Sequence, residues 1–130
     1  MKYVILIHST PRPWGHPTGD FVPENQGRSA EEREQENVEF DAMLRDMRQR
    51  GELVSAEALG DPAGSRLYRW SDGERVVTDG PYSEAKEQLA GFFLIDVDSP
   101  ERAHEIAARF GVPGETIELR PAMWPGGEDA

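Results

Sequence analysis

The segment that most constrains the fold is the apolar run at residues 91–97, GFFLIDV. Side chains alternate between the two faces of a strand, so this run places apolar groups on both faces. Phe92 and Leu94 fall on one face, and Phe93, Ile95 and Val97 on the other. Tyr3–Ile7 is a second continuous apolar run, typical of a strand buried on both faces and ended by His8. A sheet built from such strands needs cover on two sides.

Two helices are predicted from their caps and apolar stripes. The first begins at Ser29, which has capping-box spacing to Glu32, and stops before Gly51. The second follows Ser99–Pro100 and stops before Gly111. The stripes at helical spacing are Phe40, Met43, Leu44 and Met47 in the first helix, and Ala103, Ile106, Ala107 and Phe110 in the second.

The remaining predicted elements are strands at residues 52–59, 66–70, 75–78 and 115–120, with an Asp-Gly hairpin turn at 72–73 and a loop or single helical turn at 83–90. The order predicts an α+β fold: a ferredoxin-like antiparallel sheet with an extra hairpin strand and two helices on one face. We expect a single domain at 1–124 with a proline-rich loop insert at 9–28, and a loose tail at 125–130.

With two helices for one face, the second face of the sheet needs another cover. A large exposed apolar sheet face is unusual on a soluble monomer. We therefore expect a homodimer in which two sheets pack face to face and enclose a cavity. The alternative is a monomer whose proline-rich loop covers that face.

The charge balance bears on partners and location. The 130 residues include 25 acidic and 14 basic side chains, a net charge of -11, and no cysteine. Such acidity argues against nucleic-acid binding and suits either solubility or a basic partner. The absence of cysteine excludes disulfides and thiolate chemistry. Without a long apolar run or a cleavable leader, we expect a cytoplasmic protein and no membrane association.

Acid–base chemistry has two candidate catalytic residues. Asp79 opens a tight Asp-Gly-Pro turn that can aim a carboxylate into a cavity, although an Asx turn explains it as well. His8, at the end of an apolar strand, is a candidate proton-transfer partner, or simply a hydrogen-bonded strand-end histidine. No metal or organic cofactor is predicted, because the histidines are isolated and no phosphate loop is present.

Candidate substrate-binding residues come from three places in the chain. The proline-rich loop carries an aromatic side chain and a histidine, which would either face a ligand or anchor the loop. The Asp-Gly-Pro segment carries three more candidates, and the last strand ends on an arginine that suits a carboxylate or an ordinary ion pair. These residues are Trp14, His16, Tyr82, Lys86, Glu87 and Arg120.

The string DGPYSEAKE at residues 79–87 resembles the DGPF (DGPFAETKE) branch of the YCII-related superfamily, with Tyr82 in place of the phenylalanine. The opening KYVILIH, the segment GELVSAEAL after the first helix, and the closing ETIELRP are also similar. The resemblance implies a dimeric α/β barrel like that of the muconolactone-isomerase group, and no settled activity. Some members of this branch are encoded beside extracytoplasmic-function sigma factors.

Three functional hypotheses follow. The first is a cofactor-independent proton-transfer enzyme, isomerase-like or lyase-like, that acts on a small molecule in the dimer cavity through Asp79 and His8. The second is a non-catalytic module that senses a ligand or binds a regulatory protein partner, such as one linked to a sigma factor. The third is a dimerisation scaffold in which the Asp-Gly-Pro motif is purely structural.

Overall fold

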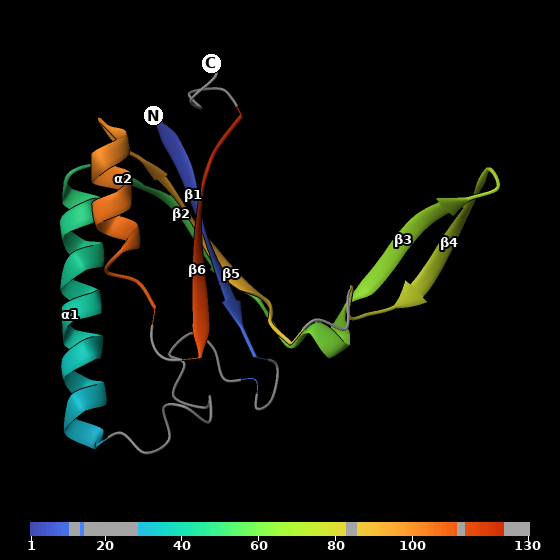
Figure 1. The fold of residues 1–130 in the computed structure, drawn as a ribbon, viewed down its shortest axis with the longest axis horizontal. Helices are drawn as coiled ribbons and strands as arrows, with labels where there is room; N and C mark the ends of the chain where they lie inside the picture. The colour runs from blue at the N-terminus through green and yellow to red at the C-terminus, as the bar shows by residue number, and fades with distance from the viewer. Residues whose placement is uncertain (11–13, 15–28, 83–85, 112–113, 124–130) are drawn as a thin grey trace.

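The computed structural model describes residues 1–10, 14, 29–82, 86–111 and 114–123. Four strands form an antiparallel sheet in the order β2-β5-β1-β6, and two more form a separate sheet, β3-β4 (Figure 1). The elements are β1 (Lys2–Ser9), α1 (Ala30–Gln49), β2 (Leu53–Ala58), the short 3-10 helix η2 (Pro62–Gly64), β3 (Arg66–Ser71), β4 (Glu74–Asp79), β5 (Gln88–Asp96), α2 (Pro100–Ala107) and β6 (Glu115–Pro121).

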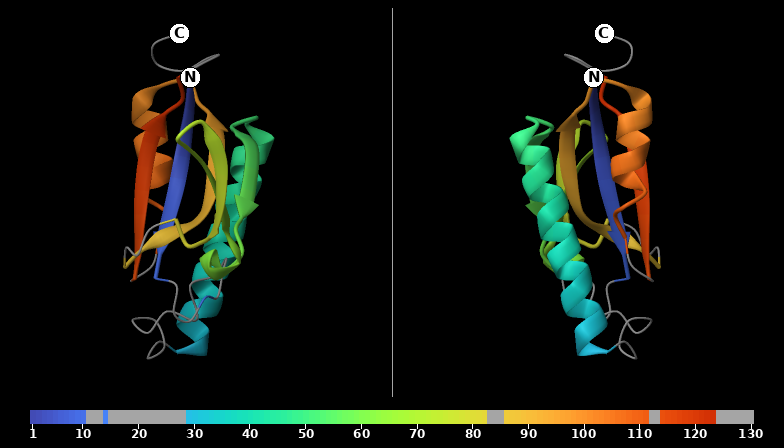
Figure 2. Two further views of the ribbon diagram at one scale, coloured as in Figure 1. Left: turned by 90° about the vertical axis from the view of Figure 1, so that its right-hand side faces the viewer. Right: turned by 90° about the vertical axis from the view of Figure 1, so that its left-hand side faces the viewer.

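Both helices lie on one face of the four-stranded sheet (Figure 2). The predicted α+β class, with an antiparallel sheet and two helices, is confirmed. The expected dimer stays a prediction. Neither described helix is long and apolar enough to cross a membrane.

The starts of both helices and the end of α1 follow from local sequence, as predicted, whereas α2 ends at Ala107 and not just before Gly111. The Ser29 hydroxyl accepts a hydrogen bond from the Glu32 backbone N–H at 3.1 Å, and the Ser99 hydroxyl accepts one from Arg102 N–H at 3.2 Å. Gly51 follows α1 with a φ of 73°, a conformation that glycine adopts without strain. These caps satisfy backbone donors that an isolated helix end would leave unpaired.

The core lies between the helices and the sheet. Both predicted helix stripes face it, with Met43, Met47 and Ile106 among its buried members. Three phenylalanines from α1, β5 and the residues after α2 pack edge to face, with ring centroids 4.8–6.1 Å apart: Phe40, Phe93 and Phe110.

Strands β1 and β5 alternate between a buried and a partly exposed face. Tyr3, Ile5 and Ile7 face the helices and are buried, whereas Val4 and Leu6 face the other way and are half-buried. A single chain therefore buries only one face of β1, and the expected burial of both faces stays a prediction for the dimer. We call the side of the four-stranded sheet opposite the helices the open face.

Two strand limits differ from prediction by more than one residue. β1 continues through His8 to Ser9, because both residues still pair with β5 and β6. β5 begins at Gln88, so the end of the predicted 83–90 loop is a strand. Gln88 and Leu89 join the sheet by pairing with β1, a tertiary contact that local sequence does not report.

The β3–β4 hairpin was expected to extend the main sheet, but the two strands pair only with each other. Asp72 and Gly73 form its turn, with φ values of 52° and 82°, which confirms the Asp-Gly prediction. The hairpin leaves the body on the side of the open face (Figure 1). The prediction that these two segments pair as a hairpin is confirmed, but the hairpin does not join the four-stranded sheet.

One buried ion pair joins the end of α1 to α2. Arg102 donates from Nε and Nη2 to the two carboxylate oxygens of Glu52, each at 2.8 Å. The side chains are only 15% and 10% exposed. The hydrogen bond from Arg102 lowers the pKa of Glu52 below its usual value and outweighs the opposing effect of burial.

The predicted loop insert at 9–28 lies largely outside the described residues, as does the tail at 125–130. The domain limits stay a prediction.

Candidate functional site

The centre of the candidate site is His8, near the end of β1 on the open face. It shares the alternation of Val4 and Leu6 and is opposite Thr116 of β6 in register. Its Nε2 lies 2.9 Å from Oε1 of Glu118, within hydrogen-bonding distance. The side chains of His8 and Glu118 are 30% and 36% exposed, so both are accessible to a ligand.

Arg120 extends this contact along β6. Its Nη2 donates to Oε2 of Glu118 at 2.6 Å, while His8 occupies the other carboxylate oxygen. The pKa of Glu118 is lowered, first by the hydrogen bond from His8 and then by that from Arg120. Glu118 is thus held as a carboxylate between two donors.

Glu87 reaches the same end of the sheet from the segment before β5. The Thr116 hydroxyl lies 2.9 Å from both Glu87 carboxylate oxygens, to which it donates. Because Thr116 is opposite His8 in register, Glu87 is brought near the histidine end of the open face. We define the open-face cluster as His8, Glu87, Thr116, Glu118 and Arg120.

The cluster borders apolar side chains on the same face. The register places Leu94 beside Val4 and Phe92 beside Leu6, and all four are half-buried. Leu89, opposite His8, is 40% exposed. An ionised carboxylate and an imidazole next to an apolar surface suit a small molecule with both polar and apolar parts.

Sequence reasoning found His8, Glu87 and Arg120, and the fold brings these three to one end of the open face. Sequence reasoning did not single out Glu118 or Thr116, the other two members of the open-face cluster. The signal was present in the alternation of the last strand, since Thr116, Glu118 and Arg120 share one face. Finding them required knowing that β6 pairs with β1.

Asp79 is placed differently. It ends β4, opposite Arg66 in register, and is exposed at the base of the hairpin. Among the described residues, the hydrogen-bonded carboxylate partner of His8 is Glu118. The proposed pairing of Asp79 with His8 therefore has no counterpart within the described part of one chain, and it stays a prediction for an assembly.

The residue after Asp79 has a clear conformational role. The backbone N–H of Gly80 donates to the Ser65 carbonyl at 2.7 Å and closes the base of the hairpin. A Cβ on Gly80 would lie 2.6 Å from the Cβ of Ser65, so no larger residue fits without a shift. This close approach explains the glycine of the Asp-Gly-Pro turn.

Tyr82 and Lys86 are exposed near this turn. Tyr82 is 77% exposed, and its ring centroid lies 5.9 Å from the guanidinium carbon of Arg69. The contact ties Tyr82 to the hairpin rather than to the open-face cluster.

Trp14 takes the anchoring position that sequence reasoning left open. Its indole N–H donates to the Leu59 carbonyl at 3.1 Å, and its ring packs against the core. His16 lies outside the described residues.

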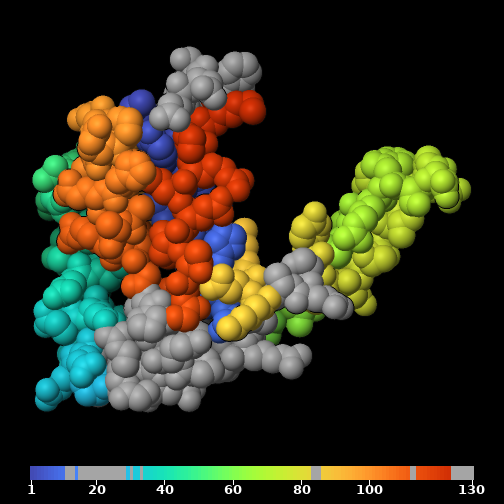
Figure 3. Space-filling model, viewed as in Figure 1, coloured from blue at the N-terminus to red at the C-terminus, as the bar shows by residue number. Residues whose placement is uncertain are grey.

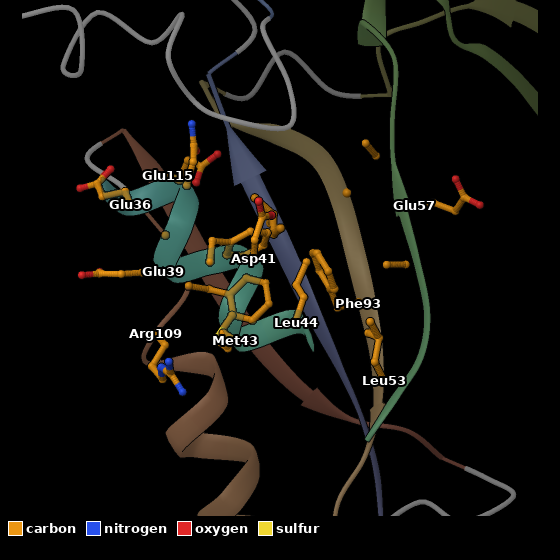
Figure 4. A pocket seen from close by; sticks show the side chains of 18 of the residues that line it. Glu36, Glu39, Asp41, Met43, Leu44, Leu53, Glu57, Phe93, Arg109 and Glu115 are labelled. Atoms are coloured by element: carbon orange, nitrogen blue, oxygen red, sulfur yellow. The ribbon is translucent and has the colours of Figure 1, made fainter. Parts of the chain in front are cut away.

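A separate pocket of about 830 Å³ lies on the helix side of the sheet (Figure 4). Its apolar lining includes Phe40, Leu44 and Phe93, while the Glu39 and Glu57 side chains point away from it (Figure 4). Catalysis needs titratable groups within reach of the reacting atoms. Charged residues also line this pocket, among them Asp41, Arg109 and Glu115. We place the candidate site at the open-face cluster because a histidine there lies within hydrogen-bonding distance of a carboxylate.

The fold and the open-face cluster define a small ferredoxin-like domain with a histidine–carboxylate pair on the sheet face opposite the helices. A family model of the YCII-related domain matches residues 1–116. A protein of Rhizobium meliloti (strain 1021), described as uncharacterized, is 38% identical over 104 residues, which are 77% of this chain and 84% of that protein. The chain belongs to the YCII-related family.

This confirms the expected superfamily. Membership of the DGPF branch stays a prediction, and the relative brings no function with it.

Proposed function

We propose that the protein is a cofactor-independent proton-transfer enzyme of the isomerase or lyase type, acting on a small molecule at the open-face cluster. The observation that supports this most is the 2.9 Å contact between His8 Nε2 and Glu118 Oε1 beside an apolar surface. An imidazole has an ordinary pKa near 6.5, so it can accept and release a proton around neutral pH.

Within this proposal, His8 is the general base and then the general acid. An ionised Glu118 accepts the Nε2 proton, which fixes the tautomer and leaves Nδ1 as the basic atom. A proton from an acidic C–H of the substrate moves to Nδ1 and is returned to a different substrate atom. No electrons leave the substrate, so the step needs no redox partner.

Arg120 and Glu87 have supporting roles. Arg120 keeps Glu118 ionised by holding the oxygen that His8 leaves free. Its exposed guanidinium also suits a substrate carboxylate or enolate. Glu87, held by Thr116, is the second carboxylate near the histidine and a candidate for receiving the proton.

A second copy of the chain is part of this proposal. Val4, Leu6, Phe92 and Leu94 leave the open face apolar and only half-buried in one chain. Face-to-face packing of two open faces would bury these residues and enclose the open-face cluster in a cavity. Asp79 is the alternative base in that assembly, as the Asp-Gly-Pro motif suggests.

The proposal is tested by solvent deuterium exchange, which detects proton transfer without knowledge of the product. Small carbonyl compounds with acidic C–H bonds are incubated in D₂O with the protein and followed by proton NMR. We expect His8→Ala to lower the enzyme-dependent exchange at least about 100-fold, as general-base loss does. The control is His104→Ala, an exposed histidine on α2. Equal exchange by the His8→Ala variant would contradict the proposal.

A regulatory module is the alternative, and one observation favours it: the net charge of -11 suits a basic protein partner. In that case the wild-type protein would exchange no compound faster than its His8→Ala variant. The same measurement therefore separates the two functions.

A further inference from the structure

The β3–β4 hairpin stands apart from the rest of the molecule. Its strands form a sheet of their own, and Figure 3 shows the hairpin separated from the body by an open hollow. It leaves on the side of the open face (Figure 1). At its base, the Gly80 N–H to Ser65 carbonyl bond joins the two strand ends to each other.

One face of the hairpin is aromatic. Alternation along β3 and the register with β4 place Tyr68 and Trp70 on the same face as Val77 and Arg75. Tyr68 is 59% exposed, Trp70 69% and Val77 49%. The guanidinium carbon of Arg75 lies 5.1 Å from the Trp70 ring centroid, a cation–π contact across the two strands. We call Tyr68, Trp70 and Val77 the arm face.

With its aromatic side chains exposed, the hairpin lacks packing that would stabilise it. An isolated two-stranded hairpin is at best marginally stable in water and gains stability by packing on something else. A buried Trp or Tyr contributes about 150–250 Å² of surface. The exposed parts of Tyr68 and Trp70 alone therefore offer roughly 200–300 Å², against about 800 Å² per partner in a standard interface.

We propose that the hairpin is a dimerisation arm whose arm face packs on a second copy of this chain and helps to close the cavity over that copy's open-face cluster. The proposal rests on the second copy in the proposed function and adds the surface that holds it. A partner of the same sequence fits for two reasons, both visible in one chain.

The first reason is self-complementarity. A two-fold dimer uses the same surfaces on both copies, so each arm can reach the other body. The described residues leave two apolar surfaces exposed: the open face, and the arm face of the hairpin that projects on the open-face side (Figure 1). Packing open face on open face places a partner in the hollow beside the arm.

The second reason is charge. Arg66 and Arg75 share the face of Tyr68 and Trp70 with one carboxylate, Asp79, so this face has an excess of positive charge, whereas the whole chain has a net charge of -11. Arginines on the arm reduce the repulsion that two such acidic bodies would otherwise feel, and Arg with Trp and Tyr is the composition typical of interface hot spots.

The test is sedimentation of the full chain. We expect the wild type to sediment with twice the 14.6 kDa chain mass at micromolar concentration. The double substitution Tyr68→Ser with Trp70→Ser should raise the dimer dissociation constant at least about 100-fold, the scale of a lost hot spot. The control is Val38→Ser, 57% exposed on α1. A monomeric wild type, or an unchanged constant in the double variant, would overturn the proposal.

A second measurement covers a variant that fails to fold. The chain has no cysteine, so a single introduced thiol can be labelled cleanly. We expect the labelling rate of Val77→Cys to fall at least tenfold as protein concentration rises through the dimer transition, while that of Val38→Cys stays constant. A labelling rate for Val77→Cys that does not change with protein concentration would overturn the proposal of a dimerisation arm.

Failure of the arm and failure of the proposed function are distinguishable. If sedimentation and labelling behave as expected but His8→Ala retains exchange, the arm stands and the catalytic proposal falls. If His8→Ala loses exchange while the arm variants stay dimeric, the catalytic proposal stands and the arm proposal falls.

Discussion

At the scale of single residues, Glu118 links the fold to the proposed chemistry. It accepts from His8 on one oxygen and from Arg120 on the other. These bonds favour the charged form, and the pKa of Glu118 is lowered accordingly. A carboxylate with a lowered pKa stabilises the fold above its ordinary range, about 4.3, and loses this contribution as pH falls through the lower native value.

The lowered pKa of Glu118 gives a prediction. His8 and Arg120 each hydrogen-bond to one of the two carboxylate oxygens, so His8→Ala and Arg120→Ala should each raise the pKa of Glu118. The measurement is an NMR titration of the Glu118 side chain in the wild type and both variants. An unchanged pKa in either variant would contradict the corresponding contact.

The Glu52–Arg102 pair gives a prediction about stability. Removing one partner of a buried ion pair leaves the other charge uncompensated, at a cost of about 3–5 kcal/mol. We expect Arg102→Met to lower the free energy of unfolding by that amount, measured by urea denaturation. Arg50→Ala is the control, because the exposed Arg50–Asp46 pair should be worth at most about 0.5 kcal/mol.

The same pair sets a pH dependence. Since the pKa of Glu52 is lowered in the fold, its contribution is complete above about pH 4.3 and is lost as pH falls through the native value. The difference in stability between wild type and Arg102→Met should therefore shrink in acid. A difference that grew below pH 4 would contradict this assignment.

At this scale the sequence singles out side chains whose type is distinctive. His8 and Arg120 were chosen as candidates because an imidazole and a guanidinium at strand ends suggest chemistry, and their role stays a prediction. Glu118 was not chosen, since one glutamate among many acidic residues is noticed only when β6 is known to lie beside β1. Sequence reasoning paired His8 with Asp79, but Asp79 belongs to the β3–β4 hairpin, which is separate from the four-stranded sheet.

At the scale of elements, the base of the hairpin is the most constrained turn. Gly80 approaches Ser65 so closely that an added Cβ would lie 2.6 Å from the Ser65 Cβ. We expect Gly80→Ala to displace the hairpin base and lower stability by about 1–3 kcal/mol, the usual cost of overpacking. Thermal denaturation measures the loss.

Gly64→Ala is the matched control, because Gly64 precedes Ser65 in the chain and nothing lies within 4 Å of a Cβ added there. An equal loss in both variants would mean that glycine flexibility, and not the close contact, explains Gly80.

Elements were predictable where local chemistry decides them. The Ser29 and Ser99 caps and the Asp72–Gly73 turn follow from neighbouring residues, and all three are confirmed. The separate β3–β4 sheet was not predicted, because alternation identifies a strand but not its partner. The early start of β5 was missed for the same reason.

At the scale of the whole molecule, one chain leaves two apolar surfaces uncovered among its described residues: the open face and the arm face. Apolar residues on both faces of the 91–97 strand predicted the first of these from sequence. The second needed the structure, since Tyr68 and Trp70 read as ordinary strand residues until the hairpin is seen to project.

The most direct test of the account is the deuterium exchange rate per chain, measured as the protein is diluted through its dimer dissociation constant. If His8 works in a cavity closed by a second copy, the rate per chain falls with the dimer fraction towards that of His8→Ala. A rate per chain that stays constant on dilution, or that His8→Ala matches at every concentration, would contradict it.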